Sequence, residues 1–410
     1  MKETMVVPSA NSNKSTEAMP SVLVVHNKYR RIGGEDTVVE NEIGLLTTLG
    51  GSVETMIYDS LDDAKISHLM RWPLRVVFNQ QTYDEMRALI RRHKTQVVHC
   101  HNLFPLLSTS IYRAARAEGV PVIQTVHNYR MGCLNGLHLR DNVICEQCRP
   151  GHHLDGIIHG CYRQSRVQSV AFGFTQAINY WSRMWDQPTL YIAPTQFLKE
   201  KLQAWGIPEQ KIVVKPHFVW PDPGRNTLPG EYALFVGRLA PEKGLDLLLD
   251  VWHRDRLPLR IVGDGPLRPH LEQRVHKEGR TNVSFAGYQD RRGVDQFLRN
   301  ARFLVMPSIW FEIFGLVVIE AYAHGVPVIA PRLGAMADVV QDGTSGLLFQ
   351  VNNREDLAVA LSRLETQPHE LAALRDGARK AFESSFSARS NAQQLRSIYL
   401  QASGQSVQQL

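Results

Sequence analysis

The chain has 410 residues, of which 43% are hydrophobic and 21% charged, a composition that excludes a disordered or fibrous protein and favours two or three soluble domains. No apolar run approaches the roughly 20 residues that span a bilayer. The net charge of +6 is compatible with anionic ligands or an anionic membrane surface, but no Lys/Arg block with interleaved aromatic residues supports nucleic-acid binding.

Residues 1–20 are predicted to form a polar, flexible tail. They lack the uninterrupted apolar core of a secretory signal peptide, so we expect a cytoplasmic protein. Five cysteines in a chain of this length do not indicate a disulfide framework.

Residues 21–214 alternate short apolar runs with helix-like stretches. The runs are SVLVVHNKY, SVETMIYDS, TQVVHCHN, PVIQTVHN and TLYIAPT, and helices are expected between them, for example over 84–93 and 108–117. Such alternation predicts a parallel sheet with helices on both faces, which is a Rossmann-like domain.

Residues 215–230 are rich in Pro and Gly and are predicted to be a hinge. The alternation then restarts and predicts a second Rossmann-like domain over 231–386. A final helix, over about 387–402, is expected to pack back on the first domain. Two doubly wound α/β domains facing a central cleft would bring the carboxyl ends of their strands, the usual ligand site of open sheets, to both walls.

Glycines mark two of these strand ends. Gly33 and Gly34 follow the first strand at a helix start, where bare amides can approach a phosphate or sugar oxygen, but the G-x-G-x-x-G and P-loop spacings are absent. Gly263 lies in IVGDGP, a turn that lets the backbone approach a nucleotide closely. Gly-rich turns of this kind are common between strands and helices, so this turn alone is weak evidence for a nucleotide site.

A pair of cations lies in LFVGRLAPEKG. A strand ends at Gly237, Arg238 follows it, and Lys243 stands just before a helix. Two cations at a strand-to-helix turn suit a phosphate or diphosphate. The alternative interpretation is that Arg238 and Lys243 are solvated loop charges without a ligand. The neighbouring motifs favour a ligand site.

Two acids frame an apolar helix in SIWFEIFGLVVIEAYAHG. Glu312 stands just before the helix, and Glu320 lies inside it after seven intervening residues. A carboxylate among apolar residues is costly to bury without a partner. We therefore expect both acids to line one wall of the cleft, with Arg238 and Lys243 nearby.

Histidines and cysteines supply further candidates. His127 closes the strand-like run TVHNYR and is predicted to face the cleft, and His99 and His101 in VVHCHN are weaker candidates of the same kind. Cys145 and Cys148 have the C-x2-C spacing of a structural zinc site. Cys133 and Cys161 would complete the set. Alternative ligands are the nearby histidines His138, His152, His153 and His159; unligated thiols in a buried or loop position are the competing interpretation.

The motifs FVGRLAPEKG, IVGDGPL, VSFAGY and MPSIWFEIFGLVVIEAYAHGVPVIAPRLGAMADVVQDGTSGLLF together resemble the family-4 retaining glycosyltransferases of the GT-B fold. The resemblance covers residues 232–349 and is looser in the first domain, through Gly33-Gly34, TVHNYR and YIAPTQFLKEKLQAWGI. The E-x7-E signature is its most specific mark.

The resemblance implies a role for each charged candidate. Arg238 and Lys243 would hold the diphosphate of a UDP- or GDP-sugar donor and neutralise it as it leaves. Glu312 would lie at the donor sugar, and Glu320 would accept hydrogen bonds from the ribose. His127 would sit beside the reacting sugar.

Other implied donor contacts come from the backbone. Gly33 and Gly34 would approach the diphosphate from the opposite domain, and the amides of Phe314, Gly315 and Leu316 would meet sugar hydroxyls or phosphate. No active-site metal and no cofactor besides the nucleotide-sugar co-substrate are implied. Retention would follow a same-face mechanism, in which the leaving phosphate accepts the proton of the acceptor hydroxyl. The family's Gly-Gly-x-Pro-Glu run is replaced here by GAMAD over 334–338.

The segment 131–163 resembles an insertion on the acceptor side, as found in some bacterial polysaccharide-building members, which suggests a glycan or lipid-linked acceptor. RWPLRVVF over 71–78 and RALIRRHK over 87–94 mix basic and apolar residues. Such patches can dock on the anionic cytoplasmic face of a membrane, although a packed helix with a solvated basic face has the same pattern.

Two other functions fit part of this pattern. A sugar-nucleotide epimerase could share the fold, but the two cations and the EIFG arrangement favour transfer. A non-catalytic nucleotide-sugar-binding protein with a Cys-rich interaction segment would not need Glu312, Glu320, Arg238 and Lys243 together.

Overall fold

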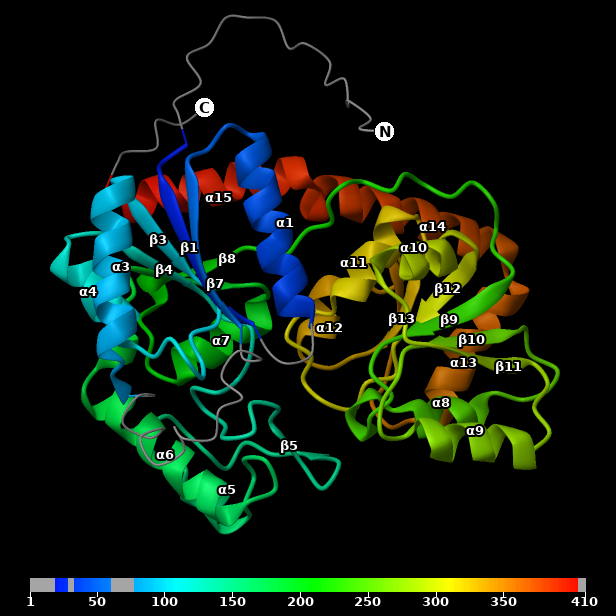
Figure 1. The fold of residues 1–410 in the computed structure, drawn as a ribbon. Coiled ribbons are helices and arrows are strands. Elements are labelled where there is room, and N and C mark those ends of the chain that lie inside the picture. The colour runs from blue at the N-terminus through cyan, green and yellow to red at the C-terminus, as the bar shows by residue number, and fades with distance from the viewer. Residues whose placement is uncertain (1–18, 29–32, 60–76, 405–410) are drawn as a thin grey trace, which may run out of the picture.

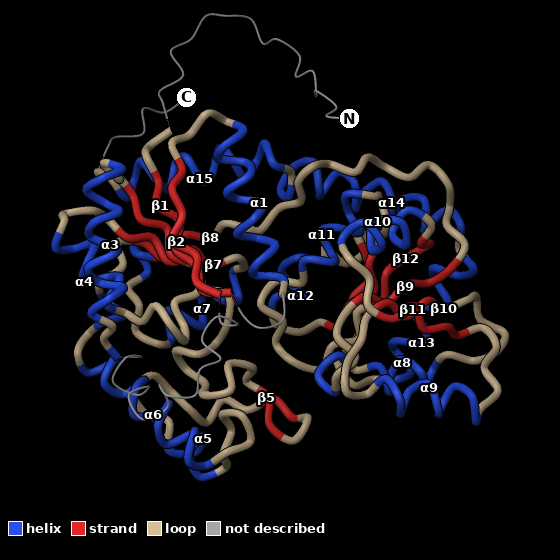
Figure 2. The backbone as a smooth tube through the Cα atoms, viewed as in Figure 1, coloured by secondary structure: helices blue, strands red, loops and turns tan. Residues whose placement is uncertain are grey.

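The computed structural model describes residues 19–28, 33–59 and 77–404, and contains two α/β units side by side (Figure 1). Residues 1–18 of the expected N-terminal tail and residues 71–76 of the basic segment lie outside the described residues. Each unit is built on a six-stranded parallel sheet, and Figure 2 shows the two sheets separately. The fold is therefore the expected pair of Rossmann-like domains.

The first sheet has the strand order β2-β1-β3-β4-β7-β8. Its strands are β1 (Val22–Lys28), β2 (Val53–Asp59), β3 (Val97–Cys100), β4 (Val122–Thr125), β7 (Leu190–Ala193) and β8 (Ile212–Val214). The strands β3, β4 and β7 are buried along their whole length, as expected for a parallel sheet covered by helices on both faces.

The helices of the first domain are α1 (Gly34–Thr48), α3 (Gln80–His93), α4 (Ser110–Ala117), α6 (Arg166–Trp181) and α7 (Gln196–Ala204). The helix expected over 84–93 begins earlier, at Gln80, because the side chain of Asn79 accepts a hydrogen bond from the Thr82 amide and caps it. The helix expected from residue 108 begins at Ser110, because Ser108 has a left-handed φ of 60°.

The second sheet has the order β11-β10-β9-β12-β13-β14. Its strands are β9 (Tyr232–Val236), β10 (Leu259–Val262), β11 (Val283–Gly287), β12 (Ala301–Val305), β13 (Val328–Pro331) and β14 (Gly346–Phe349). Its helices are α8 (Leu245–Val251), α9 (Arg268–Lys277), α10 (Arg291–Arg299), α11 (Leu316–Ala323), α12 (Ala335–Val339), α13 (Arg354–Thr366) and α14 (Pro368–Ala381).

The last helix, α15 (Ala388–Ala402), crosses back to the first domain (Figure 1). Leu395, Ile398 and Tyr399 are buried in one apolar cluster with strands β1 and β3. The Tyr399 hydroxyl also lies 2.9 Å from Nδ1 of His99 on β3. The two ends of the described chain therefore share one core.

The long connection from β4 to α6 contains little regular structure. It holds the two-residue strands β5 (Leu139–Arg140) and β6 (Val143–Ile144) and the short helix α5 (Leu154–Ile158). In Figure 1 this segment lies below the first sheet and reaches toward the second domain. No helix in the described ranges is both long and apolar enough to cross a bilayer.

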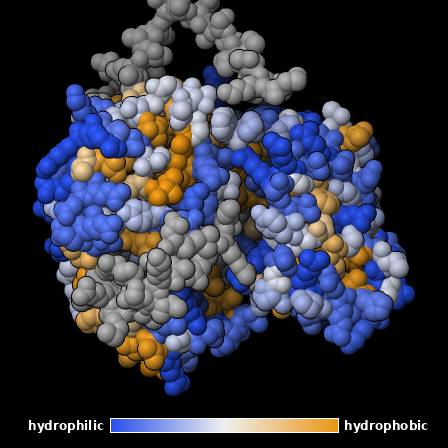
Figure 3. All heavy atoms as spheres, in the orientation of Figure 1, coloured by the Kyte–Doolittle hydropathy of each residue, from blue (hydrophilic) through white to orange (hydrophobic). Residues whose placement is uncertain are grey.

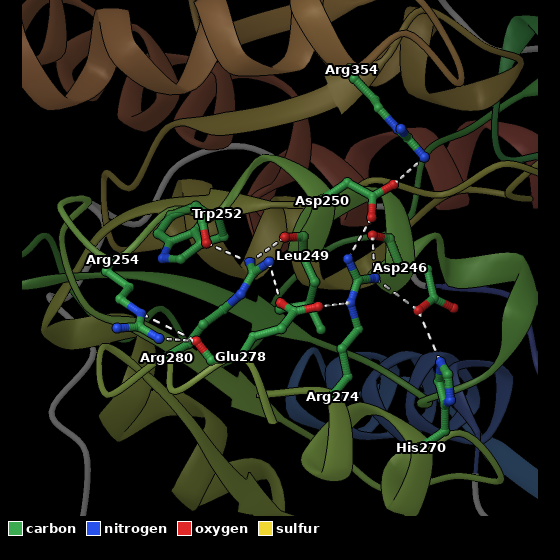
Figure 4. Close-up of polar contacts among 10 residues, drawn as sticks. All are labelled: Asp246, Leu249, Asp250, Trp252, Arg254, His270, Arg274, Glu278, Arg280 and Arg354. Carbon is green, nitrogen blue, oxygen red and sulfur yellow. Dashed lines mark hydrogen bonds and ion pairs between the residues drawn. The ribbon is translucent and has the colours of Figure 1, made fainter. Parts of the chain in front are cut away.

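A network of charged side chains joins α8 to α9 (Figure 4). Arg274 on α9 contacts Asp246 at 3.2 Å and Asp250 at 2.5 Å, both on α8, and Glu278 at 3.0 Å. Arg280 donates hydrogen bonds to the carbonyl oxygens of Leu249 and Trp252 at the end of α8. The network holds α8 on the second domain, and the turn that carries Lys243 directly precedes this helix.

Candidate active site

Lys243 and Glu312 form an ion pair in the second domain. Lys243 Nζ lies 2.6 Å from Glu312 Oε1, and the hydroxyl of Ser308 donates to the same oxygen at 2.7 Å. The Lys243 ammonium also lies 5.2 Å from the centre of the Trp310 ring, a cation–π distance. Glu312 is only 5% exposed, so water screens its charge poorly. The Lys243 ammonium compensates that charge within the fold.

Glycines allow the loops of this site to approach each other. Gly244 has a φ of 66°, and a Cβ there would lie 2.0 Å from the carbonyl oxygen of Pro307. The amide of Ile309 donates to the carbonyl of Glu242 at 3.0 Å. The turn bearing Lys243 is therefore fastened, backbone against backbone, to the loop that leads to Glu312.

The start of α11 faces the first domain. Gly315 precedes the helix with a φ of 81°, a left-handed conformation that glycine adopts without strain. A Cβ on Gly34 would lie 3.0 Å from the Leu316 side chain, so the first turns of α1 and α11 meet across the cleft. The first amides of α11 have no partner within the helix and suit an anionic group.

Glu320 is half-buried and lines a cleft of about 880 Å³ between the domains. Gly33 and Gly34 line the same cleft from the first domain. Burial raises the pKa of Glu320, and the positive charge of Arg291 opposes that rise. The second acid of the E-x7-E signature thus faces a ligand-sized cleft and not open solvent.

Two other predicted donor positions are brought together by their backbones. Gly263, with a φ of 134°, packs on the turn at Gly237, since a Cβ there would lie 1.9 Å from the Gly237 carbonyl oxygen. Arg238 follows with an exposed side chain that forms no hydrogen bond or ion pair within the described residues. The structure therefore places Arg238 beside the site but not in contact with Glu312.

His127 lies in a column of rings that runs from the first domain to the second. Its ring stacks on His101 at 5.2 Å and on His217 at 5.4 Å between centroids. His217 in turn meets the edge of Phe314 at 4.8 Å. The buried ring of Phe314 thus supports the site from behind, while the Gly315 turn presents its backbone.

Burial keeps these imidazoles neutral. It lowers the pKa of His127 well below its ordinary value, with further lowering from His101 and His217, and it lowers the pKa of His217 to about 3. His101 Nδ1 and His127 Nε2 are 2.9 Å apart. One of these two nitrogens must carry a proton and the other accept it.

Glu42 and Lys215 form a buried ion pair next to His101 of the ring column. The sequence did not predict this pair. Lys215 Nζ lies 2.8 Å from Glu42 Oε1, and His101 Nε2 lies 3.4 Å from Glu42 Oε2. Burial would raise the pKa of Glu42, but Lys215 and His101 lower it well below its ordinary value. Lys215 and His217 lie in the predicted hinge, residues 215–230, whose Pro and Gly residues give no sign of a buried ion pair.

Glu42, His99 and His101 also bring three ligand-type atoms within 4.8 Å of one another. This spacing is compatible with a metal ion. The Lys215 ammonium already contacts the Glu42 carboxylate, so a cation from the chain itself supplies the charge that a metal would bring. We assign this cluster to the support of His127.

The GAMAD stretch over 334–338, which forms the start of α12, closes the site toward the first domain. Asp338 accepts a hydrogen bond of 2.6 Å from the amide of Phe197, in the first turn of α7. Tyr129, two residues after His127, donates from its hydroxyl to the backbone carbonyl of Glu312 at 3.1 Å. Direct hydrogen bonds therefore join the two walls near the acids.

A smaller cavity lies beside His127 in the first domain. It is lined by side chains from the ends of β3 and β4 and from α6, among them Asn102, Arg130, Gln176 and Asn179. The buried amide oxygen Oε1 of Gln176 has no hydrogen-bond partner. The lining is mostly apolar with a few polar side chains, and these polar groups suit the hydroxyl groups of a ligand.

The sequence matches two adjoining family descriptions. Residues 33–222 match "Glycosyltransferase Family 4", and residues 222–381 match "Glycosyl transferases group 1". Together with the two Rossmann-like domains, these matches show that the chain belongs to the family-4 glycosyltransferases of the GT-B fold. The family expected from the E-x7-E signature and its neighbours is confirmed.

Individual relatives match over shorter stretches. An uncharacterised glycosyltransferase of Methanocaldococcus jannaschii is 38% identical over 31% of this chain and 36% of its own length. The O-antigen chain mannosyltransferase C of Escherichia coli is 31% identical over 40% of this chain and 45% of its own. The chain thus spans less than half the length of these two relatives.

The fold as a whole resembles solved structures. HepE of Anabaena, crystallised with UDP and glucose, aligns with a TM-score of 0.63 over 92% of this chain and 99% of its own, at 14% identity. At that identity the likeness concerns the fold.

Proposed function

We propose that this protein is a retaining glycosyltransferase that moves a sugar from a nucleoside-diphosphate donor to a hydroxyl of a glycan or lipid-linked acceptor. The observation that carries the proposal is the Lys243–Glu312 pair at 2.6 Å. Glu312 shortly precedes the start of α11, where Leu316 meets Gly34 of the first domain. Membership of the family supports the same activity.

Charge supplied by the chain would stabilise the leaving group. Glycosyl transfer develops positive charge at the anomeric carbon and negative charge on the departing phosphate. Lys243, Arg238 and the amides that begin α11 are positive groups on one side of the cleft, so we propose transfer without a divalent metal. Lys243 would exchange part of its contact with Glu312 for the phosphate.

The donor nucleoside would lie in the 880 Å³ cleft. Glu320 can accept hydrogen bonds from ribose hydroxyls there, and Tyr288, whose side chain is 72% exposed, offers an aromatic face for a base at the same cleft. HepE was solved with UDP and glucose, which makes a UDP-sugar the first donor to test, followed by GDP-sugars.

The acceptor would approach from the His127 side. The cavity beside His127 has polar side chains and the unpaired oxygen of Gln176. His127, held neutral by burial, can accept or donate a hydrogen bond at a sugar hydroxyl without adding charge. The mannosyltransferase that this chain resembles builds O-antigen chains, which favours polysaccharide synthesis as its setting.

A hydrophobic surface on α5 and α6 supports contact with a membrane. Val167, Val170, Phe174 and Trp181 recur on one face of α6 and are 52–80% exposed, and Figure 3 shows apolar atoms at this lower edge of the first domain. Arg166 and Arg183 flank the ends of the helix and are exposed. An exposed apolar stripe with flanking arginines suits an anionic bilayer surface.

The earlier candidate for membrane contact is explained differently. In α3, Arg87 and Arg91 both pair with Glu118, at 2.6 and 2.8 Å, and Ile90 is buried in the core. The segment 87–94 is thus a packed helix with a basic outer face, and we propose α5–α6 as the membrane-facing surface in its place.

Donor turnover tests the proposal. Release of nucleoside diphosphate from a panel of UDP- and GDP-sugars should fall by about 10²–10³-fold in Lys243→Ala, as when one group that stabilises developing charge is removed. Lys199→Ala is the matched control, because Lys199 forms a surface pair with Glu209. Unchanged turnover in Lys243→Ala would contradict the site assignment.

The structure of the reaction product distinguishes a glycosyltransferase from an epimerase. NMR of the product should show a new glycosidic bond with the anomeric configuration of the donor. Conversion of the donor to its epimer in the absence of acceptor would instead support the epimerase alternative. Binding of nucleotide with neither product would support the non-catalytic alternative.

Membrane contact has its own measurement. Flotation with vesicles containing phosphatidylglycerol should recover the wild-type protein, and Phe174→Glu should reduce recovery several-fold while leaving donor turnover with a soluble acceptor unchanged. Equal flotation of Phe174→Glu and wild type would rule out this surface. Val359→Glu, at a 58% exposed site on the second domain, is the control.

A further inference from the structure

Four of the five cysteines meet in one place. Cys133, Cys145, Cys148 and Cys161 come from three separate turns of the connection between β4 and α6, yet all four line one small pocket. The fifth, Cys100, is buried in β3 and lies outside this group. The sequence separations are C-x11-C-x2-C-x12-C.

The segment that carries these thiols has few other sources of order. Its regular elements are β5 and β6, of two residues each, and α5, of five. The apolar cluster at its centre contains only three buried residues, Leu134, Tyr162 and Phe172. Loop-rich segments with so little apolar burial are usually held by disulfides or a metal ion. All four thiols here are free.

Two of the sulfur atoms lie close to other parts of the same segment. The Cys133 thiol donates a hydrogen bond of 2.9 Å to Oδ1 of Asn135, and it would lose this proton on binding a metal. A Cβ on Gly156 would lie 3.2 Å from Cys148 Sγ, so the backbone of α5 approaches this sulfur closely.

The nearby histidines face elsewhere. The ring of His138 lies between Tyr129 and Trp205, at 5.0 and 5.7 Å between centroids, and its Nδ1 is 3.0 Å from the carbonyl of Cys145. His152 and His153 line a different hollow, against α5 and α6. Among the residues that line the thiol pocket, the metal-binding groups are the four cysteines and Asp155.

We propose that Cys133, Cys145, Cys148 and Cys161 bind one zinc ion as a tetrathiolate structural site. Zinc at about 2.3 Å from each sulfur holds the sulfurs about 3.8 Å apart. In the described structure no three of them all lie within 4.8 Å of one another, so binding would draw the three turns inward and release the thiol protons.

The site would also position a residue of the active-site wall. The amide of Cys133 donates to the carbonyl of Tyr129 at 2.9 Å, and the Tyr129 hydroxyl donates to the backbone carbonyl of Glu312. Zinc would therefore fix the turn from which Tyr129 reaches the other domain. The proposal that these cysteines bind zinc does not depend on the proposed sugar transfer.

Metal analysis of the full chain tests the proposal. Protein expressed with added zinc and purified without chelator should contain one zinc per chain by mass spectrometry. Cys145→Ser/Cys148→Ser should lose it, and Cys100→Ala should retain it. Zinc below about 0.1 per chain after reconstitution, or full zinc in the double variant, would overturn the proposal.

Wild-type protein gives a second test in case the double variant does not fold. Stepwise addition of a mercurial to the native, zinc-loaded protein should release the zinc as about four thiols react. Cobalt in place of zinc should show the visible absorption of thiolate-bound, tetrahedral cobalt. Thiol titration in denaturant without reductant should find all five thiols, and a count of three or one would show disulfides in place of the metal.

Discussion

At the scale of single residues, the support behind His127 depends on one buried ion pair. Glu42 and Lys215 are 1% and 0% exposed, and each would be an uncompensated charge without the other. Breaking a buried pair by removing one partner is strongly destabilising, because the remaining charge keeps its desolvation penalty. The pair therefore holds β8 and the residues after it against α1.

Glu42→Ala should lower the free energy of unfolding by about 3–5 kcal/mol, measured by denaturant titration. Glu40→Ala on the same helix is the control, because Glu40 is 63% exposed in its pair with Lys28 and should cost about 0–1 kcal/mol. Similar losses for the two variants would show that burial of the Glu42 pair is not the cause.

His217 predicts a pH dependence of stability. Its pKa is lowered to about 3 in the fold from the ordinary 6.5, so the unfolded chain binds the proton more readily. The contribution of His217 to the free energy of unfolding is therefore constant above pH 6.5. It falls as the pH drops toward 3, by about 2 kcal/mol at pH 5.

The measurement for His217 is a difference between proteins. Glu35, whose pKa burial raises to about 8, acts in the opposite direction, since its contribution is lost as the pH rises. Denaturant titrations of wild type and His217→Phe at pH 5 and pH 7.5 cancel that common effect. Loss of the same stability in both proteins between these pH values would contradict the prediction.

At the scale of elements, α8 is short and depends on its neighbours. Its seven residues are too few for a helix that is stable alone, and Arg274 joins both of its acids to α9 (Figure 4). This charge network supplements the apolar contacts of Leu245, Leu248 and Leu249. Because the turn with Lys243 directly precedes α8, the position of this helix fixes the position of the turn.

Arg274→Met should destabilise the protein by about 1–3 kcal/mol, because Arg274 is 21% exposed and its loss leaves Asp250 and Glu278 with fewer partners. Arg354→Met removes one contact to the same Asp250 but from a side chain that is 66% exposed, and should cost less than about 0.5 kcal/mol. Thermal unfolding compares them, and equal melting temperatures would exclude the network as a support of α8.

At the scale of the whole molecule, α15 makes the first domain depend on the end of the chain. Leu395 is fully buried against strands of the first sheet, although it follows the whole second domain in sequence. Removing its side chain leaves a cavity in that core and not in the other.

Leu395→Ala should cost about 2–5 kcal/mol and should accelerate hydrogen exchange in β1, β3 and α1. Leu361→Ala is the reciprocal control, since Leu361 is buried in the second domain and should accelerate exchange around β9 and β10. Faster exchange across both domains in each variant would show that the molecule unfolds as one unit.

Much of the fold could be predicted because its signals are local. The apolar runs of the sheets and the glycines at strand ends belong to short stretches, and strand–helix alternation restricts the topology to a few possibilities. The motif around Glu312 and Glu320 indicated the family for the same reason. Helix starts were less predictable where a side-chain cap, such as Asn79, decided them.

The arrangement of the site depended on contacts between distant parts of the chain. Lys215 and Glu42 are 173 residues apart, and no local pattern marks them as partners. The exposed side chain of Arg238 likewise follows from the packing of its turn, which no local pattern specifies.

The amino-acid order alone therefore indicated two parallel-sheet domains, a hinge, a family of sugar-transferring enzymes and a group of cysteines. The domains, the hinge and the cysteine group follow from periodicity, composition or spacing within short stretches, and the family follows from the resemblance of its motifs. Only the tertiary structure joined Lys243 to Glu312, stacked His127 between His101 and His217, and gathered four thiols into one pocket. The physical reason is that a side chain becomes buried, and finds its hydrogen-bond or ion-pair partner, only when segments distant in the sequence pack together and exclude water.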